Sequence, residues 1–252
     1  MTAIGQGREG PGANGFESSG ERDSETSDDP GRPRIVVIDD ETQTRGTFAL
    51  AYPQLDVVGA YPSVEDEMAD SPRTDLIVLD LMLDTGVAAS GVLQGPEAVH
   101  RLSQRSRVCL YTDERRLLVL ARCFVAGAIG LVRKSDPLDE NLRGFLQAAT
   151  GRPVVPRSMV GLAELLARRD RLPDLTDRQI QVLNARARGE SWQSVARRLH
   201  ISPKTAYDHL EAVMGKMVWH LHDVGLDYDA SPADIERVLG LAPGDLDDRH
   251  LE

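Results

Sequence analysis

Four short apolar runs, each followed by a residue suited to phosphate or metal chemistry, constrain the fold of this chain most strongly. The run IVVI ends on Asp39 and Asp40, LIVL on Asp80, VCLY on Thr112, and IGLVR on Lys134. The carboxyl ends of parallel strands open onto one edge of a sheet. We therefore expect three carboxylates, a hydroxyl and an ammonium group to share one pocket.

Such a pocket has a defined chemistry. Carboxylates that lie close together repel one another, and a hard divalent cation such as Mg²⁺ offsets the repulsion while keeping several waters. One Asp then remains as a nucleophile toward a phosphoryl group, with the lysine and the cation holding the charge. A single Asp after an apolar strand is more often a turn former or a helix cap. Five suitable residues at four successive strand ends favour a shared site instead.

Strand and helix patterns alternate from residue 34 to about residue 150. Apolar runs predict strands at 35–38, 57–60, 76–79, 107–111 and 129–132. Helices are expected over 42–52, 63–70, 96–104, 113–126 and 137–149. Five successive β–α units predict a doubly wound α/β domain with a five-stranded parallel sheet.

The motifs of this region resemble the receiver domain of two-component response regulators, which has a flavodoxin-like fold. They are the acidic pair in IDDE, the aspartate in DLIVLDLML, the hydroxyl in LYTDE and the lysine in GLVRKSDP. The resemblance implies a phosphoprotein with Asp80 as the phospho-acceptor. It also implies that Asp40 and Asp80 bind Mg²⁺ by their side chains and Met82 by its backbone carbonyl.

The same resemblance assigns the remaining polar residues. Asp39 would act on the metal through water or pair with Lys134, and Thr112 and Lys134 would contact the phosphoryl group.

Three features depart from the receiver pattern. Leu83 stands where the family usually has Pro, and Leu131 stands where it has the Tyr or Phe whose inward swing reports phosphorylation. The connection over 84–95 is also longer and richer in Gly and Ala than usual. The phosphoryl chemistry is therefore expected to be intact and the signalling altered.

A helical pattern begins after residue 174. Thr176 with Gln179 three residues later predicts a capping box, and Ser191 and Ser202 begin two further helices, the last running to about Met217. Two short helices, a turn and a third helix predict a small all-α helix-turn-helix domain. The residues expected to face inward are Ile180, Leu183, Ala187, Val195, Ala196 and Leu199.

This domain is similar to the LuxR-type helix-turn-helix of NarL/FixJ response regulators, in the segments LTDRQIQVL, ARGESWQSVARRL and ISPKTAYDHLEAVMGKM. That family joins the domain to a receiver in this order. The resemblance implies docking in the major groove of DNA as a homodimer. On pattern alone, a purely structural three-helix core remains an alternative.

The local charge favours contact with DNA. Residues 175–218 hold seven basic and four acidic residues, a net charge of +3, in a chain of net charge −11. A helix N-terminus can bind a backbone phosphate, and the family pattern turns the middle of the third helix toward the groove, where a carboxylate can accept from cytosine. The residues predicted to contact DNA are Arg197, Arg198, Ser202, Lys204, Thr205, Tyr207, Asp208 and Glu211.

The composition divides the chain into five parts. They are a disordered tail (1–33), the receiver (34–150), an Arg-rich linker with some helical character (151–174), the helix-turn-helix (175–218) and an acidic extension with one helix (219–252). The extension is predicted to be a packed helix followed by a solvated tail. Partner binding or DNA mimicry is the alternative.

The sequence favours a cytoplasmic, bacterial protein. It contains no apolar run near the roughly 18 residues that cross a bilayer and no signal-peptide pattern, so no membrane partner is expected. Cys109 and Cys123 form no metal-binding motif and are predicted to be buried thiols.

These observations predict a DNA-binding regulator of transcription, controlled at the Asp80 pocket by a sensor histidine kinase or a small phosphodonor. A degenerate regulator that works through protein contacts is the alternative. A phosphatase of the haloacid-dehalogenase type is a third reading, but it needs a second acid two residues after the nucleophile, where this chain has Met82. No enzyme activity is therefore predicted.

Overall fold

The computed structural model describes residues 31–83, 93–172 and 174–246. Residues 32–252 form one compact unit by their contacts. The predicted tail, most of the 84–95 connection and the end of the acidic extension lie outside the described residues. In the described ranges, every helix is too short or too polar to cross a membrane.

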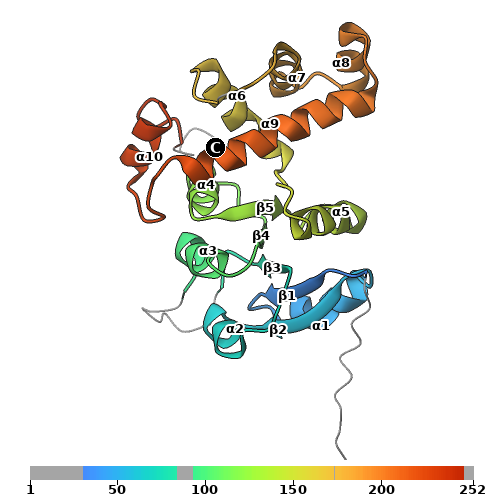
Figure 1. Cartoon of the computed structure of the whole chain (residues 1–252), viewed down its shortest axis with the longest axis vertical. Coiled ribbons are helices and arrows are strands. Elements are labelled where there is room, and N and C mark those ends of the chain that lie inside the picture. The colour runs from blue at the N-terminus through green and yellow to red at the C-terminus, as the bar shows by residue number, and fades with distance from the viewer. Residues whose placement is uncertain (1–30, 84–92, 173, 247–252) are drawn as a thin grey trace, which may run out of the picture. The chain divides into compact units, whose positions relative to one another are not determined.

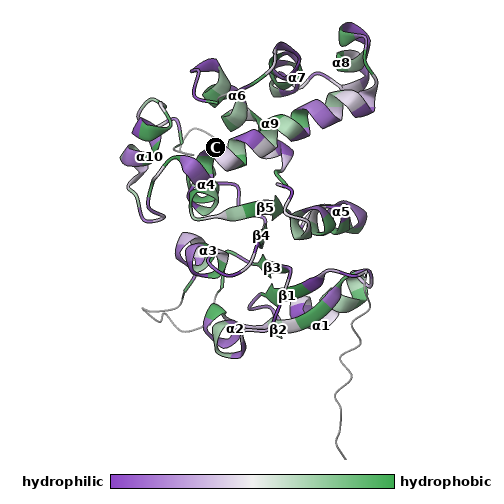
Figure 2. Ribbon diagram, viewed as in Figure 1, coloured by the Kyte–Doolittle hydropathy of each residue, from purple (hydrophilic) through white to green (hydrophobic). Residues whose placement is uncertain are grey.

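The receiver region contains one five-stranded sheet in the order β2-β1-β3-β4-β5, and all neighbouring pairs are parallel (Figure 1). Its strands carry mainly hydrophobic residues (Figure 2). The order reverses between β1 and β3, the point at which doubly wound sheets open a crevice. The strands are β1 (Arg34–Ile38), β2 (Asp56–Tyr61), β3 (Leu76–Leu79), β4 (Val108–Tyr111) and β5 (Ala128–Val132).

Five helices cover the two faces of the sheet, as predicted. Phe48 of α1 and Phe145 of α5 belong to one core cluster, whereas the buried residues of α2, α3 and α4 belong to the other. Tyr52 and Tyr111 add their rings to the first cluster, at 5.3 and 5.4 Å from Phe145. The helices are α1 (Thr42–Ala51), α2 (Val64–Asp70), α3 (Gly95–Ser103), α4 (Leu117–Val125) and α5 (Leu138–Ala149).

Helix α4 begins four residues later than the predicted residue 113. Thr112 Oγ1 accepts from the Glu114 amide at 3.3 Å, and Glu114 accepts from the amides of Arg115 and Arg116 at 2.8 Å. These amides therefore have side-chain partners outside a helix. The hydrogen bonds from Arg116 lower the pKa of Glu114 to about 2, so the loop is held by a charged acceptor.

The second half of the described chain is helical. Thr176, Ser191, Ser202 and Ser231 each cap a helix by accepting from a backbone amide, and Thr176 with Gln179 forms the predicted capping box. The elements are η1 (Arg157–Met159), α6 (Val160–Arg168), α7 (Asp177–Ala187), α8 (Trp192–Leu199), α9 (Pro203–Asp223) and α10 (Pro232–Val238).

The inward face of α7 differs from the prediction. Val182 and Leu183 are fully buried, whereas Ile180 is 37% exposed and Ala187 is exposed. The buried face also includes Gln179, whose side chain bonds the Thr176 amide and the Lys216 ammonium. Because the buried face of α7 includes the polar residue Gln179, the pattern of apolar residues alone predicted a different inward face. The predicted inward residues of α8 are all buried.

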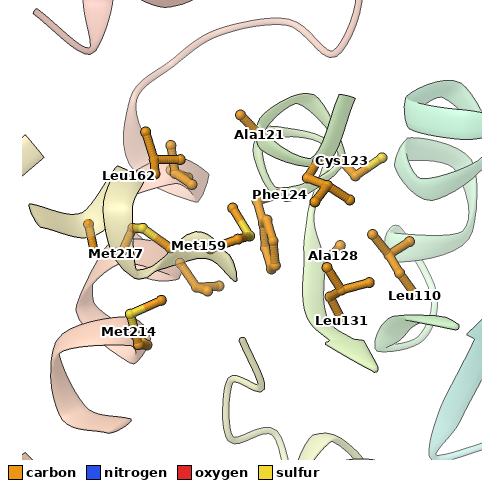
Figure 3. Close-up of a cluster of buried hydrophobic side chains, with 14 of the residues drawn as sticks. Leu110, Ala121, Cys123, Phe124, Ala128, Leu131, Met159, Leu162, Met214 and Met217 are labelled. Carbon is orange, nitrogen blue, oxygen red and sulfur yellow. The ribbon is translucent and has the colours of Figure 1, made fainter. Parts of the chain in front are cut away.

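The segment predicted as an Arg-rich linker packs against both halves of the chain. Val154 pairs with Gly130 beside β5 and extends the edge of the sheet. Met159 and Leu162 belong to a buried cluster with Phe124 of α4 and Met217 of α9 (Figure 3). This burial explains why α9 continues six residues beyond the predicted end, since Val218 and Leu221 are fully buried in the same cluster.

The C-terminal extension is also packed. Arg122 of α4 donates to the carbonyls of Asp229 and Ala230, and the rings of His100 and Tyr228 stack at 4.7 Å. Arg169, directly after α6, pairs with an Asp245 carboxylate oxygen at 3.0 Å. The extension therefore contacts α4 and the residue that follows α6 by polar groups.

Removing the Phe124 side chain should destabilise the fold strongly, because this ring is fully buried where α4, α6 and α9 meet. We expect Phe124→Ala to lower the free energy of unfolding by about 3–5 kcal/mol, measured by urea denaturation. Leu50→Ala, at an 80% exposed position of α1, is the control and should change it by less than about 0.5 kcal/mol. Equal losses in the two variants would contradict the assigned packing.

Candidate functional site

The carboxyl edge of the sheet gathers the predicted acidic residues. Asp39 and Asp40 follow β1 and Asp80 follows β3, and one carboxylate oxygen from each lies within 4.8 Å of the others. Asp39 is 1% and Asp80 6% exposed. Thr112 follows β4 at the same edge and is buried, with 3% of its surface exposed. The sheet order therefore brings together carboxylates that are 40 residues apart in sequence.

Lys134, two residues after β5, reaches this acidic cluster. Its ammonium nitrogen lies 2.8 Å from Oδ2 of Asp39 and 2.8 Å from Oδ2 of Asp80. Burial raises the pKa of Asp39, although Lys134 opposes the shift. Burial by itself would lower the pKa of Lys134, but the two carboxylates raise it above its usual value. The lysine therefore stays charged and compensates both carboxylates.

The donors of this cluster fit a hard divalent cation. Asp39 Oδ1 accepts from the Glu41 amide at 2.9 Å, while its buried Oδ2 has no partner with hydrogen-bond geometry in the described part of the chain. The three carboxylates each offer one oxygen within 4.8 Å of the others. Carboxylate oxygens are ligands that suit Mg²⁺.

Two residues beside Asp80 have distinct positions. The Met82 amide donates to Asp80 Oδ1 at 3.3 Å, while the Met82 side chain is 60% exposed. Leu83 is 3% exposed and belongs to the core. The backbone after Asp80 therefore stays close to the Asp80 carboxylate.

Leu131 occupies the position at which receivers carry an aromatic ring. It is 1% exposed and packs in the apolar cluster drawn in Figure 3. A buried branched side chain at this position gives the pocket no ring to move.

Sequence reasoning missed three residues that order this edge. Arg45 donates to the Asp39 carbonyl at 2.6 Å, and Asp113 accepts from the amide and hydroxyl of Ser135 at 3.1 and 2.7 Å. Asp113 thereby ties the loop after β4 to the loop after β5, which carries Lys134. The position of Asp113 directly after Thr112 is the sequence feature that could have identified it.

The predicted DNA-contacting residues lie on α8 and the first half of α9. Ser202 caps α9 and its hydroxyl lies 2.8 Å from that of Thr205, while Lys204 pairs with Asp208 at 3.0 Å. Tyr207 is 47% exposed. The exposed start of α9 therefore carries both a cation and its partner acid.

The other predicted contacts are partly engaged within the chain. Arg198 pairs with Glu190 at 2.9 Å, whereas Arg197 is exposed. Glu211 lies 3.9 Å from Arg152 of the segment after α5. A groove of about 520 Å³ brings Lys204, Asp208 and Glu211 beside Gln147 of α5. The structure thus places the middle of α9 next to the receiver.

Comparison with known proteins extends these observations. A family model described as bacterial regulatory proteins, luxR family, matches residues 173–222. The DNA-binding transcriptional activator DevR/DosR of Mycobacterium tuberculosis is 28% identical over 196 residues, which cover 73% of this chain and 88% of the relative. The nitrate/nitrite response regulator NarL of Escherichia coli is 26% identical over 198 residues, which cover 73% and 88%.

A solved RcsB response regulator of Salmonella typhimurium matches 83% of this chain and 99% of its own, with 15% identity and a TM-score of 0.46. The motifs at the sheet edge, the luxR-family match over residues 173–222 and the similarity to regulators over about three quarters of the chain make the chain similar to the NarL/FixJ family of response regulators.

Proposed function

We propose that this chain is a two-component response regulator that binds DNA to regulate transcription and is controlled by phosphorylation of Asp80. The observation that carries the proposal is the acidic cluster with Lys134 at 2.8 Å from two of its members, in a chain that also has a luxR-type domain. A relative named as a DNA-binding transcriptional activator supports the output. The protein acts in the cytoplasm, as a regulator and not as an enzyme.

In the proposed reaction, a carboxylate oxygen of Asp80 attacks the phosphorus of a sensor kinase phosphohistidine or a small phosphodonor. The new O–P bond forms as the bond from phosphorus to the donor breaks, and the donor leaves with that electron pair. Lys134 then pairs with the phosphoryl oxygens and Thr112 contacts one of them. These groups offset the charge that phosphorylation adds.

Mg²⁺ is the proposed cofactor, held by the side chains of Asp40 and Asp80 and the backbone carbonyl of Met82. Asp39 acts on it through water or remains paired with Lys134. When bound, the cation neutralises charge on the transferring phosphoryl group. The convergence of three carboxylate oxygens within 4.8 Å of one another supports this assignment.

The proposed output is the binding of a homodimer to paired half-sites, with α9 in a major groove. Ser202, Lys204 and Thr205 hold a backbone phosphate at the start of this helix. Arg197 and Arg198 lie on α8, from which they flank the DNA strand that carries this phosphate. The side chains that reach base edges are Tyr207, Asp208 and Glu211.

A degenerate regulator that works through protein contacts is the second candidate. The pairing of Lys204 with Asp208 at 3.0 Å favours it, because this partner acid reduces the positive charge that the start of α9 offers to DNA. Leu131 favours it as well, since phosphorylation has no ring to move there.

Phosphorylation should be specific to Asp80. Incubation with acetyl phosphate and Mg²⁺ should add one phosphoryl group by intact mass, because Lys134 is placed to pair with the acyl phosphate. The gain should vanish in Asp80→Asn and on removal of Mg²⁺ with EDTA. It should persist in Asp56→Asn, which changes an exposed carboxyl on β2. An unchanged wild-type mass would favour the degenerate regulator.

Phosphorylation should change the oligomeric state weakly. Leu131 is packed with 1% exposure and cannot give the aromatic movement that relatives use. Light scattering of the free protein should therefore report nearly the same mass before and after acetyl phosphate. A complete monomer-to-dimer shift would show that another residue transmits the signal.

Lys204 should contribute equally to the affinity for all DNA sequences. Lys204→Ala should weaken binding to all DNA fragments alike and make the salt slope shallower by about one. Asp208→Asn should leave non-specific binding equal or tighter, because it frees Lys204 from a partner at 3.0 Å. Changing Tyr207 or Glu211 should instead alter discrimination between sites by about 1–3 kcal/mol.

The matched control is Arg168→Ala, which removes an exposed cation from α6 and should leave DNA affinity nearly unchanged. Gel-shift titration at several salt concentrations measures all these variants. Wild-type protein without salt-dependent affinity for DNA, even at low ionic strength, would remove the transcription-factor function and leave the protein-contact function.

A further inference from the structure

A cavity of about 450 Å³ lies between α5, the segment after it and the helix-turn-helix. Its volume is within the range of about 300–1,000 Å³ that small-molecule sites occupy. Gly144 and Arg143 of α5 line it on the receiver side, and Arg157, Trp192 and Tyr207 line it on the other. None of these five residues belongs to the acidic cluster at Asp80. The cavity is therefore a separate candidate site.

The helix-turn-helix side of the cavity is aromatic. The rings of Trp192 and Tyr207 lie 5.6 Å apart at 60° to one another. Arg186 lies 4.3 Å and Arg157 lies 6.0 Å from the centre of the Trp192 ring. Burial lowers the pKa of Arg186, and the positive charge of Arg157 lowers it further. Two guanidinium groups thus gather at one aromatic ring and repel each other.

Some of the charged side chains that line the cavity have ion-pair partners, and others do not. Within the described residues, Arg157 and Arg133 make no ion pair with a carboxylate, and Arg133 donates only to the Ser158 hydroxyl at 3.0 Å. By contrast, two of the three lining carboxylates already have arginine partners. Those pairs are Glu140 with Arg143 and Glu211 with Arg152, both at 3.9 Å.

Only one other lining carboxylate, Asp136, remains without an ion pair in the described part. The lining thus holds three arginines and three carboxylates, and Arg157 and Arg133 are the two of these arginines that have no carboxylate partner among the described residues. Guanidinium groups bind carboxylates with two parallel hydrogen bonds, and flat rings pack against Trp and Tyr. The lining thus offers one surface for an anion and one for an aromatic ring.

We propose that this cavity binds a small, flat aromatic anion, with its ring against Trp192 and Tyr207 and its acidic group at Arg157 and Arg133. The binding does not depend on phosphorylation or on DNA. Because Tyr207 belongs both to the cavity and to the proposed DNA-binding face, bound ligand competes with DNA for this side chain. That second consequence rests on the proposed function.

The test uses 2-naphthoate as the probe and 2-naphthalenemethanol as its neutral counterpart. The chain contains two tryptophans, so the full-length protein labelled with ¹⁵N-tryptophan gives two indole signals, which Trp219→Phe assigns. Trp219 does not line this cavity and serves as an internal control. The Trp192 signal should shift and saturate with a Kd of about 1 mM or tighter, as expected for about 13 non-hydrogen atoms.

Two variants separate the anion site from general apolar binding. Arg157→Gln should weaken 2-naphthoate binding about tenfold, the usual cost of losing a charge-assisted hydrogen bond. Arg143→Gln is the matched control, because it removes the same charge from the same cavity at a residue already paired with Asp139 and Glu140. It should change the Kd by less than about threefold.

Three results would overturn the proposal. They are the absence of a saturable Trp192 shift, equal binding of the neutral alcohol, and equal losses in the two arginine variants. A gel-shift at saturating 2-naphthoate should also show weakened DNA binding. If the protein binds no DNA under any condition, the proposed function fails, while the Trp192 titration still decides the ligand site.

Discussion

The ammonium group of Lys134 stabilises a cluster of three carboxylates that would otherwise repel one another. Parallel pairing in the order β2-β1-β3-β4-β5 brings Asp39, Asp40 and Asp80 to one edge. Two of these carboxylates are almost fully buried, so the cost of leaving their charge uncompensated is large. Lys134 lies 2.8 Å from both. The position of this lysine after β5 thus depends on the full sheet, and the acidic pocket depends on the lysine.

The loops around the pocket are fixed by polar contacts that only the folded chain reveals. Arg45 holds the Asp39 carbonyl, and Asp113 holds the loop that carries Lys134. The segment before α4 is ordered in the same way, by Glu114 and its hydrogen bonds to two amides. The geometry of the acidic pocket therefore depends on side-chain to backbone hydrogen bonds as well as on the strands.

The sequence predicted the elements that depend on local patterns. The strand ends, the Thr176 capping box and the Ser202 cap needed only apolar runs and short-range spacing, and the structure contains all of them. The end of α9 depends instead on burial in a cluster that includes Phe124, about 90 residues away in sequence. Local spacing also assigned Ile180 to the inward face of α7, because nothing local shows that Gln179 bonds Lys216.

The sequence predicts where the site residues lie better than it predicts which other side chains they contact. The strand ends correctly predicted that the acidic residues and Lys134 lie together, but the sequence could not show that Glu211 faces Arg152. This pair exists because α9 lies beside the segment after α5. The sequence motif of one helix does not show which other segments pack against it. Polar side chains of α9 were therefore predicted to contact DNA.

Helix α9 links the two halves of the chain through both of its ends. Its last turns are buried with Phe124, and His222 contacts the Ala128 carbonyl at 3.0 Å. Its first turns carry Tyr207, which lines the cavity beside α5. Movement of the receiver relative to α9 must therefore break apolar packing at one end and change the cavity at the other. Since Leu131 gives the Asp80 pocket no mobile ring, the ligand proposed for the cavity would be the more direct way to favour one arrangement of the two halves over another, because residues of both halves line the cavity.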